Sequence, residues 1–159
     1  MSTKEEVQEL VEFGTNIVQE SGEIALKYFR TNLDVSNKQL GGKFDPVTLA
    51  DSEIEEYLRA KILESYPGHT VIGEEAGETS GTDAYSWLID PIDGTRGFVA
   101  GSPMWGTLLG LMEDDECIVG LMNQPFVKET YIGSQVGAFI LNDSGKTQIH
   151  TSNKDQLSD

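Results

Sequence analysis

Apolar and polar residues alternate with a helical period over the first thirty positions of the chain. Between residues 3 and 30 the apolar side chains recur three and four positions apart, and glutamates occupy many of the positions between them. This spacing predicts one long amphipathic helix with a buried face and a solvated acidic face. A second helix is predicted to begin between Thr48 and Asp51, both capping residue types, and to end before Pro67 and Gly68.

The pattern changes after residue 68 to short apolar runs bounded by turn residues, which predict strands. The runs are residues 70–72, 86–89, 105–112, 117–122, 130–132 and 138–141, with hairpin turns expected at 114–116 and 142–145. The polar segment 31–44 is predicted to be a loop. Two helices followed by mostly antiparallel strands indicate an α+β fold in which the helices pack on the sheet.

The charge of the chain excludes two classes of partner. It has 11 Lys and Arg against 27 Asp and Glu, a formal net charge of −16. Such a protein repels phosphate backbones and anionic lipid, so we expect neither nucleic-acid nor membrane binding. Because Cys117 is the only cysteine, no intramolecular disulfide can form, which is typical of a cytoplasmic protein. No apolar run approaches the length of a membrane span.

Three acidic segments fall at the ends of predicted elements: residues 45–51, 73–75 and 90–95. In the last of these, Asp90 and Asp93 follow an apolar strand, and Gly94 permits a tight turn. A helix starting there would direct backbone amides at an anion. Each segment alone is also ordinary turn or cap chemistry, but three together would repel one another without a cation. Ligands that are all oxygen favour Mg²⁺ or Mn²⁺ over zinc, and the two histidines, His69 and His150, are expected at the surface.

These segments, in this order, resemble the inositol monophosphatase family of Mg²⁺-dependent phosphatases. The resemblance lies in residues 45–48 with Asp51, in Val71-Ile72-Gly73-Glu74-Glu75, and in Trp87-Leu88-Ile89-Asp90-Pro91-Ile92-Asp93-Gly94-Thr95. The last stretch is a specific signature, whereas the first two alone would be weak. The resemblance implies that the chain is the N-terminal half of a layered α/β/α/β sandwich, with residues 1–150 as the metal- and phosphate-binding domain and 151–159 starting the connection to an absent C-terminal domain.

The resemblance also implies a set of metal ligands. Glu74, Asp90 and the carbonyl of Ile92 would bind a first ion, and Asp90 and Asp93 would share a second. About two or three Mg²⁺ ions would occupy the complete site, and Mn²⁺ could replace them. Thr95, hydrogen-bonded to Asp51, would activate a water for in-line attack on phosphorus.

Substrate contacts follow from the same resemblance. The implied substrate-binding residues are Glu74, Ile92, Asp93, Gly94, Thr95 and Arg96, with the amides of Gly94 and Thr95 on the phosphate. The segment from Arg96 to Leu108 is similar to the histidinol-phosphatase branch, which suggests hydrolysis of histidinol phosphate. Two alternatives stay open: an inositol-1-monophosphatase, or a noncatalytic acidic module that binds cations or a partner. Family members are commonly homodimers, and a chain of this length is expected to be a fragment with weak metal binding and little turnover.

Overall fold

A computed structural model describes residues 2–31, 35–37 and 46–153, and only backbone is considered for 35–37 and 46–48. The elements are α1 (Lys4–Tyr28), β1 (Val35–Asn37), β2 (Pro46–Thr48), α2 (Leu49–Ser65), β3 (Thr70–Gly73), β4 (Gly77–Thr79), β5 (Tyr85–Asp93), α3 (Thr95–Val99), β6 (Gly106–Glu113), β7 (Glu116–Gln124), β8 (Glu129–Ser134), β9 (Gly137–Asn142) and β10 (Gly145–Gln148).

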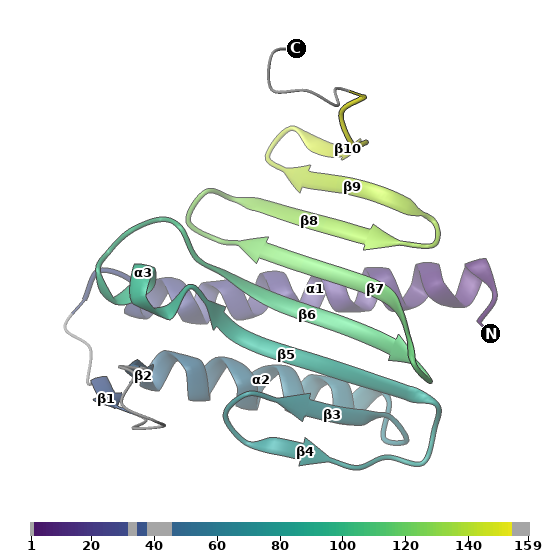
Figure 1. The fold of residues 1–159 in the computed structure, drawn as a ribbon, viewed down its shortest axis with the longest axis horizontal. Helices are drawn as coiled ribbons and strands as arrows, with labels where there is room; N and C mark the ends of the chain where they lie inside the picture. The colour runs from purple at the N-terminus through teal and green to yellow at the C-terminus, as the bar shows by residue number, and fades with distance from the viewer. Residues whose placement is uncertain (1, 32–34, 38–45, 154–159) are drawn as a thin grey trace.

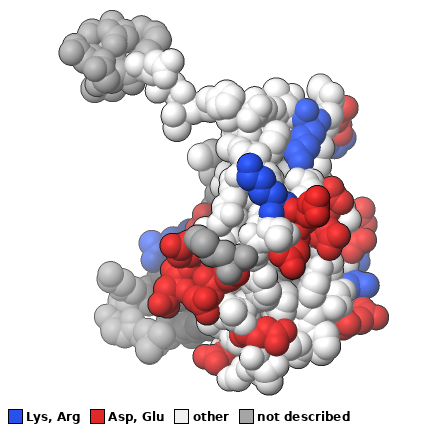
Figure 2. Space-filling view, turned by 90° about the vertical axis from the view of Figure 1, so that its right-hand side faces the viewer, with Lys and Arg blue, Asp and Glu red and all other residues white. Residues whose placement is uncertain are grey.

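The long first helix is confirmed, and its start has a chemical cause. Thr3 caps α1 by accepting from the backbone N–H of Glu6, while the Glu6 carboxylate accepts from the N–H of Thr3. This reciprocal pair satisfies two amides that would otherwise lack partners. The buried face of α1 carries Val7, Leu10, Val11, Ile17, Val18 and Ala25. The glutamates between them are exposed, and acidic side chains cover more of the face in Figure 2 than basic ones do.

The helices α1 and α2 lie side by side on one face of an eight-stranded sheet (Figure 1). The hydroxyl of Tyr57 on α2 donates to Glu20 on α1, and that of Tyr28 on α1 donates to Glu53 on α2. Burial, and then the hydrogen bond to Glu20, raise the pKa of Tyr57 to about 12. These contacts fix the lateral position of one helix against the other.

The order of strands in the sheet is β10-β9-β8-β7-β6-β5-β3-β4, and every neighbouring pair is antiparallel except β3 and β5. Along β5 the side chains alternate between the two faces of the sheet, as the pleat requires. Trp87 and Ile89 are buried against the helices, whereas Leu88 between them is 41% exposed on the opposite face. The core therefore lies between the sheet and the two helices.

The predicted α+β architecture is confirmed, including both helices, the six strands and both hairpin turns. The pattern did not reveal β4 and β10, because their exposed sequences Gly-Glu-Thr and Gly-Lys-Thr-Gln lack a buried face. Within the predicted loop 31–44, residues Val35–Asn37 form a strand that pairs with β2. The rest of that loop, apart from Thr31, lies outside the described residues. Among the described residues, no helix has the length and apolar character that a bilayer crossing requires.

One expectation about histidines was wrong. His150 is exposed as predicted, but His69 is only 6% exposed and accepts a hydrogen bond from the indole N–H of Trp87. The Pro-Gly turn before His69 suggested a surface position. The ring instead packs between Tyr66 and Tyr85, because the turn directs the chain back into the sheet.

Candidate functional site

The parallel pairing of β3 with β5 brings two of the predicted carboxylates to the same edge of the sheet. Gly73 at the end of β3 lies opposite Ile89 of β5, so Glu74 and Asp90 follow at equivalent places. The backbone N–H of Glu74 donates to the carbonyl of Ile89 over 3.3 Å. Because parallel neighbours end at a common edge, this is the place where the first residues after each strand meet.

The strand β5 continues further than the sequence pattern suggested. It runs through the signature to Asp93, and its register against β6 shifts between Asp90 and Asp93. The hydroxyl of Thr107 on β6 donates to the carbonyl of Pro91 over 2.8 Å and holds this irregular stretch against the sheet. The irregularity is a bulge, a feature that re-aims side chains at the edges of sheets.

Gly94 makes the turn from β5 into α3. Its φ is 84°, a left-handed conformation that residues with a Cβ adopt at a cost. A Cβ at this position would also lie 2.8 Å from the carbonyl oxygen of Met104, too close for an unstrained contact. Both restrictions require glycine here. The short helix α3 then begins at Thr95, the place where the sequence allowed a helix start.

Asp90 is the electrostatic centre of the site. Its Oδ1 atom is buried and has no hydrogen-bond partner among the described residues. Burial, followed by repulsion from Glu74, Asp93 and Asp51, raises the pKa of Asp90 to about 7. A buried carboxylate oxygen without a donor, repelled by other carboxylates, is unfavourable unless a cation or a proton joins it. The donor set is all oxygen, so these residues fit Mg²⁺.

The described residues contain no group of three His, Cys, Asp or Glu side chains that closes around one ion. The predicted ligand sets do not require such a group. Each takes two carboxylates of this chain, either Glu74 and Asp90 or Asp90 and Asp93, and the first adds the carbonyl of Ile92. That carbonyl accepts a hydrogen bond from Thr95 Oγ1 over 2.9 Å. The assignment of these ligands stays a prediction.

Asp51 and Thr95 lie in the first turns of α2 and α3, respectively. Asp51 is 4% exposed and is close enough to Asp90 to raise its pKa. A hydroxyl group has one proton, and that of Thr95 points to Ile92. Of these described residues, Thr95 therefore donates to Ile92 and not to Asp51 in this structure, which differs from the hydrogen bond that the resemblance implied.

A hollow of about 430 Å³ opens beside the carboxylates on the sheet face that the helices leave open. Glu74 and Asp90 line it together with Leu88 and Leu108. Its size falls in the range of sites that hold small molecules. Arg96 is exposed on α3, next to the Gly94 turn. Its predicted role as a substrate contact stays a prediction.

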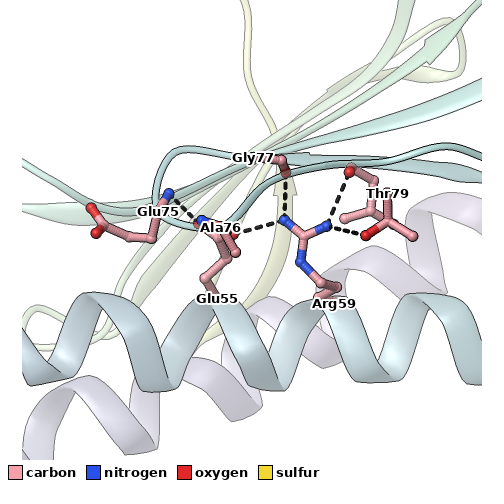
Figure 3. A network of polar contacts seen from close by, with 7 residues as sticks. Glu55, Arg59, Glu75, Ala76, Gly77 and Thr79 are labelled. Carbon is pink, nitrogen blue, oxygen red and sulfur yellow. Dashed lines mark hydrogen bonds and ion pairs between the residues drawn. The ribbon is translucent and has the colours of Figure 1, made fainter.

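Sequence reasoning missed Glu55, the most deeply buried acidic side chain among the described residues, at 1% exposure. Its carboxylate accepts from the backbone amides of Glu75 and Ala76 over 2.7 and 2.9 Å and forms an ion pair with Arg59 at 2.7 Å (Figure 3). A signal was present in the sequence, because Glu55 follows the apolar Ile54 on the buried side of α2, four residues before an arginine.

Comparison with known proteins agrees with this architecture. The sequence model described as the inositol monophosphatase family matches residues 6–159. The "Bifunctional phosphatase IMPL2, chloroplastic" of Arabidopsis thaliana is 38% identical over 130 residues, which cover 80% of this chain and 37% of that protein. The "Histidinol-phosphatase" of Chlorobaculum parvum is 32% identical, over 84% of this chain and 51% of that protein.

Among solved structures, the IMPase of Thermotoga maritima superposes with a TM-score of 0.80 at 27% identity. The match covers 94% of this chain and 56% of that one. The chain thus spans about half, or less, of the length of these relatives. The family match covers nearly all of the sequence, and the fold agrees with a solved member. The chain therefore belongs to the inositol monophosphatase family.

Proposed function

We propose that the protein containing this chain is a Mg²⁺-dependent phosphatase that hydrolyses a small phosphate monoester. The observation that supports this most strongly is the state of Asp90, whose buried Oδ1 has no hydrogen-bond partner among the described residues and whose pKa three further carboxylates help to raise. A protein keeps such a repulsive arrangement where a cation offsets it. Because the chain belongs to a family of phosphatases, such a cation would assist the hydrolysis of a phosphate ester.

The residues divide into two roles under this proposal. Glu74, Asp90 and the Ile92 carbonyl hold one ion, and Asp90 with Asp93 contributes to a second. Bound Mg²⁺ lowers the pKa of water and offsets the charge of the phosphate. It would also relieve the repulsion that raises the pKa of Asp90.

Thr95 would accept the proton of the attacking water while passing its own hydroxyl proton to the Asp51 carboxylate. For this, the Thr95 hydroxyl must donate its hydrogen bond to the Asp51 carboxylate instead of to the Ile92 carbonyl. Rotation about one C–O bond redirects the proton of a hydroxyl, provided that Asp51 lies within reach. The amides of Gly94 and Thr95, at the turn into α3, would donate to the phosphate oxygens.

We propose histidinol phosphate as the substrate. The segment from Arg96 to Leu108 supports this choice through its similarity to histidinol phosphatases, and proteins named histidinol-phosphatase occur among the relatives. An inositol phosphate is the second candidate, because inositol monophosphatases also occur among the relatives at similar identity. The exposed guanidinium of Arg96 would interact with the organic part of the ester.

The test is phosphate release by the full-length protein that contains this chain. Histidinol phosphate and inositol 1-phosphate are compared with and without Mg²⁺, and we expect Mg²⁺-dependent release with preference for histidinol phosphate. Asp93→Asn should abolish release, whereas Asp115→Asn, the same change at an exposed hairpin turn, should not. A preference for inositol 1-phosphate would overturn the assignment of histidinol phosphate as the substrate. Failure to release phosphate from these two esters and from any other small phosphate monoester, with Mg²⁺ present, would overturn the proposed phosphatase activity and favour a noncatalytic module.

A further inference from the structure

The turn between β3 and β4, which carries Glu74, is held from below by two side chains of α2 (Figure 3). The Glu55 carboxylate accepts the backbone amides of the two residues that follow Glu74 in the chain. These are charge-assisted hydrogen bonds at 2.7 and 2.9 Å, roughly twice as strong as neutral ones. They fix the path of the backbone immediately after Glu74.

Arg59 secures the same turn on its other side. Its guanidinium donates to the carbonyl of Val71 over 3.1 Å, to that of Gly77 over 2.7 Å and to the hydroxyl of Thr79 over 2.8 Å. It also donates to Glu55 Oε1 over 2.7 Å, so the two charges neutralise each other inside the protein. The pair therefore contacts the chain both before and after Glu74.

Gly73 shows how closely the Glu55 carboxylate approaches the backbone. A Cβ at Gly73 would lie 2.0 Å from Oε1 of Glu55, so only glycine leaves room for the carboxylate. The ion pair is nearly dry, since the side chains of Glu55 and Arg59 are 1% and 14% exposed. An apolar pair could fill the same space, and burying two charges adds little stability by itself. The hydrogen bonds from Glu55 and Arg59 to the backbone on both sides of Glu74 give the ion pair a role that an apolar pair could not supply.

We propose that Glu55, oriented by Arg59, is a positioning residue that sets Glu74 beside Asp90 and thereby controls cation affinity. This inference rests on the proposed function, because it assumes that Glu74 and Asp90 share an ion. Glu55 contacts the backbone around the ligand and not the ion itself. Loss of residues that orient a metal ligand commonly lowers metal affinity by about 10- to 100-fold.

Mg²⁺ titration of the full-length protein that contains this chain, followed by calorimetry, tests the inference, with Glu55→Gln as the principal variant. Glutamine keeps the length of the side chain but replaces one acceptor oxygen by a donor, so it cannot accept both amides and pair with Arg59. We expect the dissociation constant for Mg²⁺ to rise about tenfold or more. Glu56→Gln is the matched control, because Glu56 is exposed on the same helix, and it should stay within about twofold of the unaltered protein.

A second measurement separates positioning from mere stability. Hydrogen exchange at the amides of Glu75 and Ala76 should accelerate in Glu55→Gln and not in Glu56→Gln, while the thermal midpoint reports the fold as a whole. Arg59→Lys, which keeps the charge but loses the planar fork, should give a smaller loss of affinity in the same direction. It serves as the informative variant if Glu55→Gln does not fold.

The outcomes distinguish the two proposals. If the unaltered protein binds Mg²⁺ and neither Glu55→Gln nor Arg59→Lys changes the affinity, the positioning role is wrong and the metal site stands. If the affinity falls only in proportion to unfolding, the pair is structural and the inference is also overturned. If the unaltered protein binds no Mg²⁺ at millimolar concentration, the proposed metal site fails and the inference fails with it.

Discussion

Trp87 donates its indole N–H to Nδ1 of His69 over 3.0 Å, and both side chains are buried. Nδ1 must therefore be the unprotonated nitrogen of the ring. His69 also stacks on Tyr66, with ring centroids 4.6 Å apart. Burial lowers the pKa of His69, and the charge of Asp83 opposes this effect more weakly. The fold thus depends on a neutral histidine.

His69 should make the stability of the protein fall on mild acidification. Its pKa in the unfolded chain is about 6.5 and is lower in the folded protein, so the unfolded state binds more protons between these values. The free energy of unfolding should therefore fall as the pH drops below about 6.5. In His69→Asn, whose Oδ1 can accept from Trp87 without titrating, the fall should be smaller.

Urea denaturation of both proteins at pH 7.5 and pH 5.5 measures this difference. His150→Asn is the control, because it makes the same change at an exposed position. Equal pH dependence in His69→Asn and the unaltered chain would show that His69 is protonated without cost.

Asp90→Asn should stabilise the protein without metal at alkaline pH. The pKa of Asp90 is raised from 3.8 to about 7, so stability is lost as the pH rises through this interval. Asparagine removes the repulsion, and we expect a gain of about 1–2 kcal/mol at pH 8, after allowing for solvent screening. The gain should shrink toward pH 4. Thermal unfolding checks it, and added Mg²⁺ should raise the midpoint of the unaltered chain only; a less stable variant at pH 8 would contradict the prediction.

Thr107→Val should destabilise the protein by removing a hydrogen bond that holds the signature segment against the sheet. Thr107 is fully buried, and its hydroxyl is a donor to the Pro91 carbonyl. Valine fills the same space but leaves a buried carbonyl without this donor, which costs about 1–3 kcal/mol. Chemical denaturation should show the loss. Thr147→Val on the exposed strand β10 should cost less than about 0.5 kcal/mol, and similar losses in both variants would disprove the role of the buried hydroxyl.

Gly94→Ala and Gly77→Ala should separate two kinds of strain. Both glycines have positive φ, 84° and 71°, so alanine adds a conformational cost of about 1–2 kcal/mol at each. Only Gly94 also faces an obstacle, the Met104 carbonyl, whereas a Cβ at Gly77 meets nothing within 4 Å. Gly94→Ala should therefore be clearly the more destabilising by thermal unfolding. Equal shifts would mean that the backbone at Met104 yields freely.

Much of the fold could be read from the sequence because periodicity reports burial. The helical stripe of α1 and the apolar runs of β5 to β8 each bury one face, so their spacing identifies them. The strands β4 and β10 bury little and pair with their neighbours mainly through the backbone, which leaves no apolar pattern in the side chains. His69 was misplaced because a local turn signal says nothing about the ring that lies across it.

The candidate site was only partly readable for a different reason. Asp90 and Asp93 stand in a signature whose spacing is itself informative, whereas the parallel pairing that brings Glu74 beside them is a long-range property of the sheet. From the sequence alone, Glu55 looks like the solvent-exposed glutamates that are common on helices. Apart from the ion pair with Arg59, its contacts are with backbone amides, and backbone amides are the same at every position of a sequence.

The stretch from α2 through β3, β4 and β5 to α3 contains every predicted residue of the candidate site, from Asp51 to Arg96, in one continuous run of chain. Contacts between neighbours in sequence close short loops, and short loops form quickly during folding. The hairpins between β6 and β9 close shorter loops than the parallel pairing of β3 with β5, so the carboxylates should meet after these hairpins have formed. Their mutual repulsion would then oppose a late step of folding, and a divalent cation in the refolding buffer should accelerate that step as well as stabilise the product.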